Sequence, residues 1–223
     1  MKKYVNLFVF VFMIGACLSQ GRAQTKSAVS YKNPVVDIAM PDPTVIKAAD
    51  GYFYVYATES TRNVPIMKSK DLVEWTYCNT AFTNKTRPRF EPKAGIWAPD
   101  INYINGKYVL YYAMSVWGGE QTCGIGVATA NSPQGPFTDH GKMFRSNEIG
   151  VQNSIDPSLL QYEGRNYLVW GSFRGIYVIE LTADGLSIMP GAKKKRIAGT
   201  AFEAVYIHKY GDYYYMFASI GSC

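Results

Sequence analysis

One pattern recurs four times along this chain, and the repetition limits the folds that the chain can adopt. Each copy begins with an acidic residue beside a strand-like run, turns at a glycine, and returns on a strand rich in tyrosine. The copies span 42–56, 100–112, 156–170 and 203–217. A repeat of about fifty residues with a strand pattern inside it predicts radial repetition, as in a β-propeller.

The rest of the chain also favours strands over helices. Aromatic residues make up 15% of the chain, and Tyr and Phe prefer pleated, half-buried surfaces. Asp50-Gly51 and Asn105-Gly106 are strong hairpin turns, because these residue types tolerate positive φ, and Glu163-Gly164 and Gly211-Asp212 hold the matching places in the later copies. No window of about a dozen residues shows helical periodicity. The sequence therefore predicts an all-β domain.

Residues 1–24 have the features of an export signal and lie outside the predicted domain, which spans 25–223. A basic start at Lys2 and Lys3 precedes a short apolar run, and cleavage near Ala23 fits a secretory signal. Cys17, which follows Ile-Gly-Ala, also resembles the lipid-bearing cysteine of a bacterial lipoprotein. We expect an exported protein, periplasmic or extracellular, and the second alternative would anchor it to an outer membrane by a lipid.

Charge and cysteine content exclude several classes of function. The chain carries a net charge of +6, of which the leader supplies three, so nucleic-acid binding is not implied. No segment after the leader is apolar and long enough to cross a membrane. Cys78, Cys123 and Cys223 remain after the leader without the spacing of a zinc site, and their disulfide state is left open.

The acids that open the copies predict the chemistry of the domain. Equivalent strands around one axis would bring Asp42, Asp156 and Glu203 to one pocket, and Asp100 has the same phase. Proline follows Asp42 and Asp156, as expected at the start of a strand. Glycoside hydrolysis requires paired carboxyl groups, about 6.5–9.5 Å apart when the anomeric configuration is inverted. The residues alone therefore favour a glycosidase, and they do not exclude Asp100 from its site.

Four motifs together resemble glycoside hydrolase family 43, and above all its arabinanase branch. They are the segments 40–44, 97–100, 153–157 and 202–204, read in this order along the chain. The resemblance runs from about Asn33 to the end of the chain. It implies a five-bladed β-propeller and an inverting mechanism. By the same resemblance Asp42 matches the general base, Glu203 the general acid, and Asp156 the acid that tunes the pKa of Glu203.

The resemblance also implies that the chain is truncated at its C-terminus. About four blades are present, and the family continues into a fifth. We expect this incomplete propeller to be poorly soluble or inactive, and the complete protein to be a monomer. The resemblance implies no required cofactor. A channel metal such as calcium is compatible with it, but neither His140 nor His208 matches the family's histidine, so no metal ligand is assigned.

Several further residues are candidates for contact with an oligosaccharide or polysaccharide substrate. Trp97 and Trp117 have the flat apolar faces that stack on sugar rings. Asn153, Ser154 and Ser172 carry side chains that hydrogen-bond sugar hydroxyls.

The leading interpretation is an exported, inverting glycosidase that acts on arabinan or on arabinose-containing plant polysaccharide. A β-xylosidase or an exo-acting α-L-arabinofuranosidase is the alternative within the enzyme class, and endo against exo action is left open. A non-catalytic carbohydrate-binding propeller is the alternative of another class. The retained acids argue against it, because a binding module has no use for them.

Overall fold

The structure is a computed structural model, and it describes residues 30–221. The predicted signal at 1–24, the lipoprotein alternative at Cys17 and the last cysteine, Cys223, lie outside the described residues. The chain divides into two compact units, 1–31 and 32–223. Everything below concerns the second unit.

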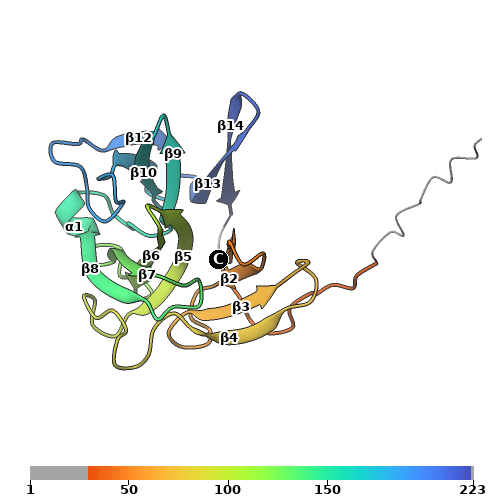
Figure 1. Cartoon of the computed structure of the whole chain (residues 1–223). Helices are drawn as coiled ribbons and strands as arrows, with labels where there is room; N and C mark the ends of the chain where they lie inside the picture. The colour runs from red at the N-terminus through yellow and green to blue at the C-terminus, as the bar shows by residue number, and fades with distance from the viewer. Residues whose placement is uncertain (1–29, 222–223) are drawn as a thin grey trace, which may run out of the picture. The chain divides into compact units, whose positions relative to one another are not determined.

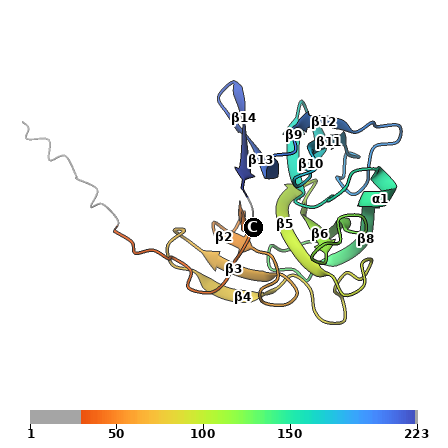
Figure 2. The same cartoon turned by 180° about the vertical axis from the view of Figure 1, so that it is seen from behind.

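Strands form almost all of the regular structure, arranged as three four-stranded sheets and one hairpin (Figures 1 and 2). All pairs are antiparallel, and each sheet follows the order of its strands in the sequence. One four-residue helix, α1 (Ser146–Ile149), is the single helix among residues 30–221. The prediction of an all-β fold with about four propeller blades is confirmed. The strands are β1 (Thr44–Lys47), β2 (Phe53–Tyr56), β3 (Pro65–Ser69), β4 (Thr76–Thr80), β5 (Gly95–Ile104), β6 (Lys107–Ser115), β7 (Gly124–Ala130), β8 (Thr138–Arg145), β9 (Ser158–Tyr162), β10 (Arg165–Trp170), β11 (Ile176–Glu180), β12 (Lys195–Ala198), β13 (Phe202–Tyr210) and β14 (Tyr213–Ile220).

The first hairpin of each repeat closes at the turn that the sequence predicted. Asn105 and Gly106 have φ of 48° and 81° between β5 and β6, and Glu163 and Gly164 have 49° and 72° between β9 and β10. Two successive positive φ angles give the type I′ turn, whose twist matches that of paired strands. The turns therefore fix the register that brings the start of one strand beside the end of the next.

Three apolar clusters hold neighbouring sheets together. The first lies between β1–β4 and β5–β8 and includes Tyr56 and Phe137, whose rings meet edge to face at 6.1 Å. The second lies between β5–β8 and β9–β12, around the fully buried Trp170. The third is smaller and seats Val205 of the hairpin against β10 and β11. Burial of these side chains supplies the main driving force for packing sheet on sheet.

The first strands of the four sheets contact one another in sequence. Strand β1 lies against β5, β5 against β9, and β9 against β13. This is the arrangement of inner strands in a propeller, and it brings the opening residues of all four repeats together.

The hairpin β13–β14 is the least covered part of the fold. Every residue of β14 is exposed, including Phe217 and Ile220 at 58% and 73%.

Among the described residues Cys78 and Cys123 are both free thiols. No helix in this part of the chain is long and apolar enough to span a bilayer.

Candidate active site

Four inner-strand residues share a left-handed backbone that marks the equivalent point of each repeat. They are Asp42, Ala98, Asp156 and Ala204, with φ of 49°, 40°, 56° and 50°. Proline follows the first three, and Val205 follows the fourth. Non-glycine residues rarely adopt this conformation, and it is concentrated at functional sites. The fold therefore repeats one uncommon local geometry around its axis.

The prediction that Asp100 has the same phase as Asp42 and Asp156 is wrong. Ala98 occupies that place in the second repeat, and Asp100 lies two residues further, level with Thr44 and Ser158. The prolines at 43, 99 and 157 mark the equivalent position, because each follows the residue with the left-handed backbone. Spacing between acids alone does not show this position.

Asp42, Asp156 and Glu203 line one pocket of about 580 Å³. They come from three different sheets: Asp42 and Asp156 each stand two residues before a strand, and Glu203 is the second residue of β13. A cavity of this size suits one or two sugar rings or a comparable small ligand. The structure thus brings together the three acids that the sequence selected.

The three carboxyl groups interact electrostatically. Burial, and after it the neighbouring charges of Asp42 and Glu203, raise the pKa of Asp156 to about 7. The N–H of Ala204 donates to Asp156 Oδ2 at 3.2 Å and partly offsets these effects. A carboxyl group that titrates near neutral pH beside two others is typical of acid–base sites.

Hydroxyl groups hold the other two acids. Thr58 donates to Asp42 Oδ2 at 2.5 Å and accepts from the N–H of Ala98 at 2.7 Å. Ser172 donates to Glu203 Oε2 at 3.2 Å. Thr58 follows β2, in the same repeat as Asp42. Ser172 follows β10, in the repeat before that of Glu203.

These hydroxyl residues belong to a second repeat signal, of which only Ser172 is a candidate on sequence grounds. Thr58, Ser115, Ser172 and Ser219 stand at or just beyond the end of the second strand in the four repeats, and all four line the pocket. Their period matches that of the acids. The signal was present in the sequence, but serine and threonine are too common on strands for it to stand out.

Trp97 and Trp117 lie at the pocket, as predicted. Their rings are 5.7 Å apart and tilted by 53°. Trp117 is 84% exposed, whereas Trp97 folds back over Gly95, where a Cβ would lie 2.4 Å from the indole nitrogen. The pair presents apolar ring surface to the pocket, which suits a sugar face.

Asn153 and Ser172 also line the pocket, and Asn153 Nδ2 donates to the backbone oxygen of Ser172 at 3.0 Å. Ser154 does not, which corrects its assignment as a substrate-binding residue. It is fully buried, donates to Val151, and accepts from the Trp170 indole at 3.1 Å. Asn153 has a left-handed φ of 53°, and the turn there directs its neighbour into the core.

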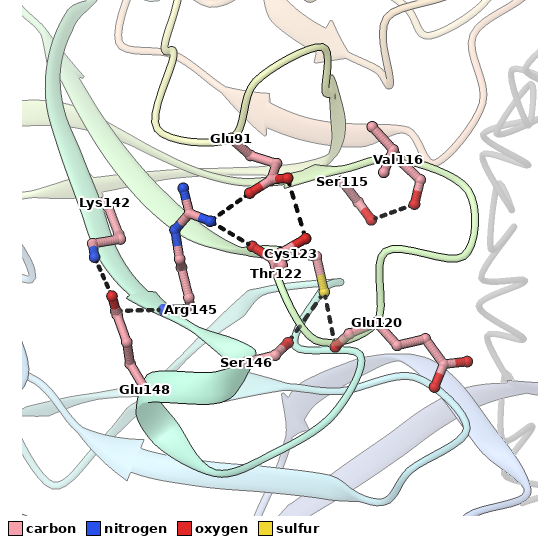
Figure 3. Close-up of polar contacts among 10 residues, drawn as sticks. All are labelled: Glu91, Ser115, Val116, Glu120, Thr122, Cys123, Lys142, Arg145, Ser146 and Glu148. Atoms are coloured by element: carbon pink, nitrogen blue, oxygen red, sulfur yellow. Dashed lines mark hydrogen bonds and ion pairs between the residues drawn. The ribbon is translucent and has the colours of Figure 1, made fainter.

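Residues 116–120 of the β6–β7 loop line the pocket, among them Trp117 and Glu120, and polar contacts hold the end of this loop in place. Arg145 binds Glu91 at 2.5 Å, and Thr122 donates to the same carboxylate at 3.1 Å. Figure 3 shows these contacts around Glu91. Nearby, the thiol of Cys123 lies 3.1 Å from the hydroxyl of Ser146. This network fixes the end of the loop against β8 and α1.

Two further pocket residues had no signal in the sequence. Glu120 and Phe173 line the pocket from the loops of the second and third sheets. Arg174 donates to both carboxylate oxygens of Glu120, from Nε at 3.0 Å and from Nη2 at 2.8 Å, and so joins the two loops. Among residues 30–221 there is no cluster of three or more His, Cys, Asp or Glu side chains suited to a metal ion, so metal ligands stay unassigned.

Comparisons with known proteins identify the relatives of this chain. The profile of glycosyl hydrolases family 43 matches residues 31–223. The arabinan endo-1,5-alpha-L-arabinosidase A of Aspergillus niger is 32% identical over 191 residues, which cover 82% of this chain and 58% of that protein. The extracellular endo-alpha-(1->5)-L-arabinanase 1 of Bacillus subtilis is 35% identical over 196 residues, covering 82% and 59%. The chain thus spans less than two thirds of these relatives' length.

Solved structures agree with this grouping. The native arabinanase Arb43A of Bacillus subtilis superposes with a TM-score of 0.73 and 32% identity, over 84% of this chain and 68% of that structure. An alpha-L-arabinanase of Cellvibrio cellulosa in complex with arabinohexaose gives 0.73 and 28%, over 83% and 66%.

Proposed function

The chain belongs to glycosyl hydrolases family 43, and on this basis we propose that the full-length protein hydrolyses the glycosidic bonds of arabinan with inversion of configuration. The observation that carries the proposal is the meeting of Asp42, Asp156 and Glu203 in one pocket beside the indole rings of Trp97 and Trp117. Family membership gives the reaction class, and the pocket supplies the groups that the reaction needs.

Each acid has a distinct role in the proposed mechanism. Asp42 is the general base that removes a proton from the attacking water, and the hydrogen bond from Thr58 holds its carboxyl group in place. Glu203 is the general acid that protonates the leaving oxygen. Asp156 lies close enough to both for their charges to raise its pKa, and we assign it the tuning role beside the general acid that the family resemblance implies.

Arabinan is the proposed substrate because of the relatives that the chain resembles. The Aspergillus niger and Bacillus subtilis proteins are both named for action on arabinan, and the Cellvibrio cellulosa structure holds arabinohexaose. Since the Bacillus protein is described as extracellular, we propose that this protein too is exported, and that it acts as a monomer.

The decisive experiment measures the sugars released from linear arabinan, and from xylan as the rival substrate, by the purified protein. Proton NMR of the first-formed product should show the anomer opposite to that of the cleaved bond. Asp42→Asn should abolish release, whereas Asp37→Asn, which makes the same change at an exposed site, should not. Retained configuration or a trapped glycosyl-enzyme would exclude inversion.

The same assay distinguishes the alternative functions. Faster release from xylo-oligosaccharides would favour a β-xylosidase, and release of arabinose alone from chain ends would indicate an exo-acting enzyme. Binding of arabinohexaose without release would indicate a carbohydrate-binding propeller.

A further inference from the structure

Asp100 is a buried acid that the proposed mechanism does not use, and its hydrogen bonds join three sheets. Only 8% of its surface is exposed. Its Oδ2 accepts from the N–H of Leu159 at 2.8 Å and from Nδ2 of Asn102 at 2.7 Å. Its Oδ1 accepts a longer bond, 3.5 Å, from the hydroxyl of Thr44, which itself accepts from the N–H of Ile101 at 3.3 Å. Strands β1, β5 and β9 are therefore tied together at one carboxylate.

The two partners of Asp100 on other sheets lie close to catalytic acids in the sequence. Thr44 is the second residue after Asp42, and Leu159 is the third after Asp156. Two or three residues of strand span only about 7–10 Å. The proline after each acid removes freedom from this short connection, because its ring fixes φ. A shift of β1 or β9 relative to Asp100 would therefore move the carboxyl group attached to it.

The same set of contacts continues to the fourth sheet. The hydroxyl of Ser158 donates to the backbone oxygen of Val205 at 2.7 Å, and Val205 is the second residue after Glu203. We call Thr44, Asp100, Ser158, Leu159 and Val205 the inner belt. Its contacts cross three successive sheet boundaries. Thr44, Ser158 and Val205 each stand two residues after one of the acids.

We propose that Asp100 is a positioning residue that sets the separation of the Asp42 and Asp156 carboxyl groups by holding strands β1 and β9 on its two sides. This inference rests on the proposed function, in which those two groups act on one substrate. Separation matters because the charge of Asp42 acts on Asp156, and this interaction weakens with distance. Three donors converging on one buried carboxylate fix distances that apolar contacts between sheets leave adjustable.

Asp100 does not line the pocket that holds Glu203, Trp97 and Trp117. It lines a second pocket, of about 630 Å³, together with Asp42 and Asp156, and neither Trp97 nor Glu203 lines that pocket. Burial raises the pKa of Asp100 to about 6, and the donors around it act in the opposite direction. The carboxyl group is therefore ionised above neutral pH, which strengthens the bonds from its three donors.

Two substitutions at Asp100 separate its geometry from its charge. Asp100→Asn removes the charge but keeps an oxygen for Leu159 and an amide that donates to Thr44. Asp100→Ala removes both. Thr44→Val breaks the contact to β1 alone and keeps the shape of the side chain, so it provides the test if Asp100→Ala does not fold. Thr129→Val is the matched control, because it breaks a 2.8 Å hydrogen bond to His140 within a single sheet.

The first measurement follows the titration of Asp156 by carbon NMR in protein labelled at aspartate, with Asp156→Asn to assign its signal. Because Asp42 contributes to the raised pKa of Asp156, this pKa reports the separation of the two groups. We expect it to fall towards its ordinary value in Asp100→Ala and Thr44→Val. We expect it to stay near the wild-type value in Asp100→Asn and Thr129→Val.

The second measurement is hydrolysis of linear arabinan. We expect kcat to fall about 10- to 100-fold in Asp100→Ala with KM little changed, and Asp100→Asn to retain most activity, since displacement of reacting groups by about 1 Å has effects of this size. An unchanged titration of Asp156 in a folded Thr44→Val or Asp100→Ala protein would overturn the inference. Absence of hydrolysis by the wild-type protein would instead count against the proposed function, because the titration does not depend on turnover.

Discussion

The hydroxyl of Thr58, just after β2, donates a 2.5 Å hydrogen bond to Asp42, just before β1. The same oxygen accepts from the backbone of Ala98 in the second sheet. Thr58 therefore orients the proposed base and joins it to the neighbouring blade. A hydrogen bond to a charged group contributes about 1.5–3 kcal/mol, so this one contact is large enough to matter for catalysis.

Replacement of Thr58 by valine should lower kcat on arabinan about tenfold or more, with little change in KM. Valine keeps the shape of threonine but leaves Asp42 free to rotate and without its donor, and each 1.36 kcal/mol lost from the transition state costs about tenfold. Steady-state kinetics check this. Thr61→Val, at an exposed position three residues on, is the control and should behave as wild type. Equal kinetics for the two variants would contradict the role of Thr58.

Glu203→Gln should impair substrates with poor leaving groups far more than aryl glycosides with good ones. Glutamine cannot donate the proton that a poor leaving group needs, whereas a nitrophenolate departs without it. Comparison of kcat/KM on arabino-oligosaccharides and on nitrophenyl arabinofuranoside tests the assignment. Similar losses on both substrates would assign the proton donor elsewhere.

Asp156→Asn should stabilise the protein at pH 8 and have no effect at pH 4. The pKa of Asp156 is about 7 in the folded protein, above the usual value of about 3.9 in an unfolded chain. At pH values between these two pKa values, Asp156 is therefore protonated in the folded state but ionised in the unfolded chain. The stability that this bound proton contributes is lost as pH rises through 7. Asparagine cannot ionise, so it avoids that loss.

Melting temperature as a function of pH measures this effect. Each kcal/mol corresponds to about 2–4 °C for a chain of this length. Asp37→Asn, at an exposed position, should show no difference from wild type at either pH. A gain in Tm of equal size at pH 4 and pH 8 would show that titration of Asp156 is not its cause.

The two ion pairs of Figure 3 should differ sharply in their contribution to stability. Arg145→Met leaves Glu91, whose side chain is 10% exposed, without its cation, and should cost about 2–3 kcal/mol. Lys142→Met breaks the exposed pair with Glu148 and should cost less than about 1 kcal/mol. Urea denaturation of both variants gives the comparison, and equal losses would contradict it.

The sequence predicted the three acids of the pocket because each carries a local mark. Asp-Pro at 42 and 156 shows where an inner strand begins, and the period of the repeat brings Glu203 to the same axis. The same period misplaced Asp100 by two residues, since an acid was counted without regard to the proline beside it. The turn at Asn105-Gly106 was predictable for a similar local reason, which is the tolerance of both residues for positive φ.

What the sequence did not reveal depends on contacts between sheets. Ser154 was placed in the pocket, but a left-handed turn at Asn153 sends it into the core against Trp170. Thr58 carries no mark of its role, since its partners Asp42 and Ala98 reach it only after the strands have paired and packed. Single residues with a left-handed backbone and hydrogen bonds between blades depend on tertiary structure. The periodicity of a strand does not predict them.

The shared left-handed backbone of Asp42, Ala98, Asp156 and Ala204 bears on how a pocket of this kind changes over evolutionary time. In a fold that repeats one unit, the backbone determines where a side chain points, and mutation then varies only which side chain stands there. Codons for alanine and aspartate differ by a single nucleotide, so an acid can enter or leave the ring at Ala98 without any alteration of the sheets. Selection can therefore adjust the number of charges around the axis separately from the architecture that holds them.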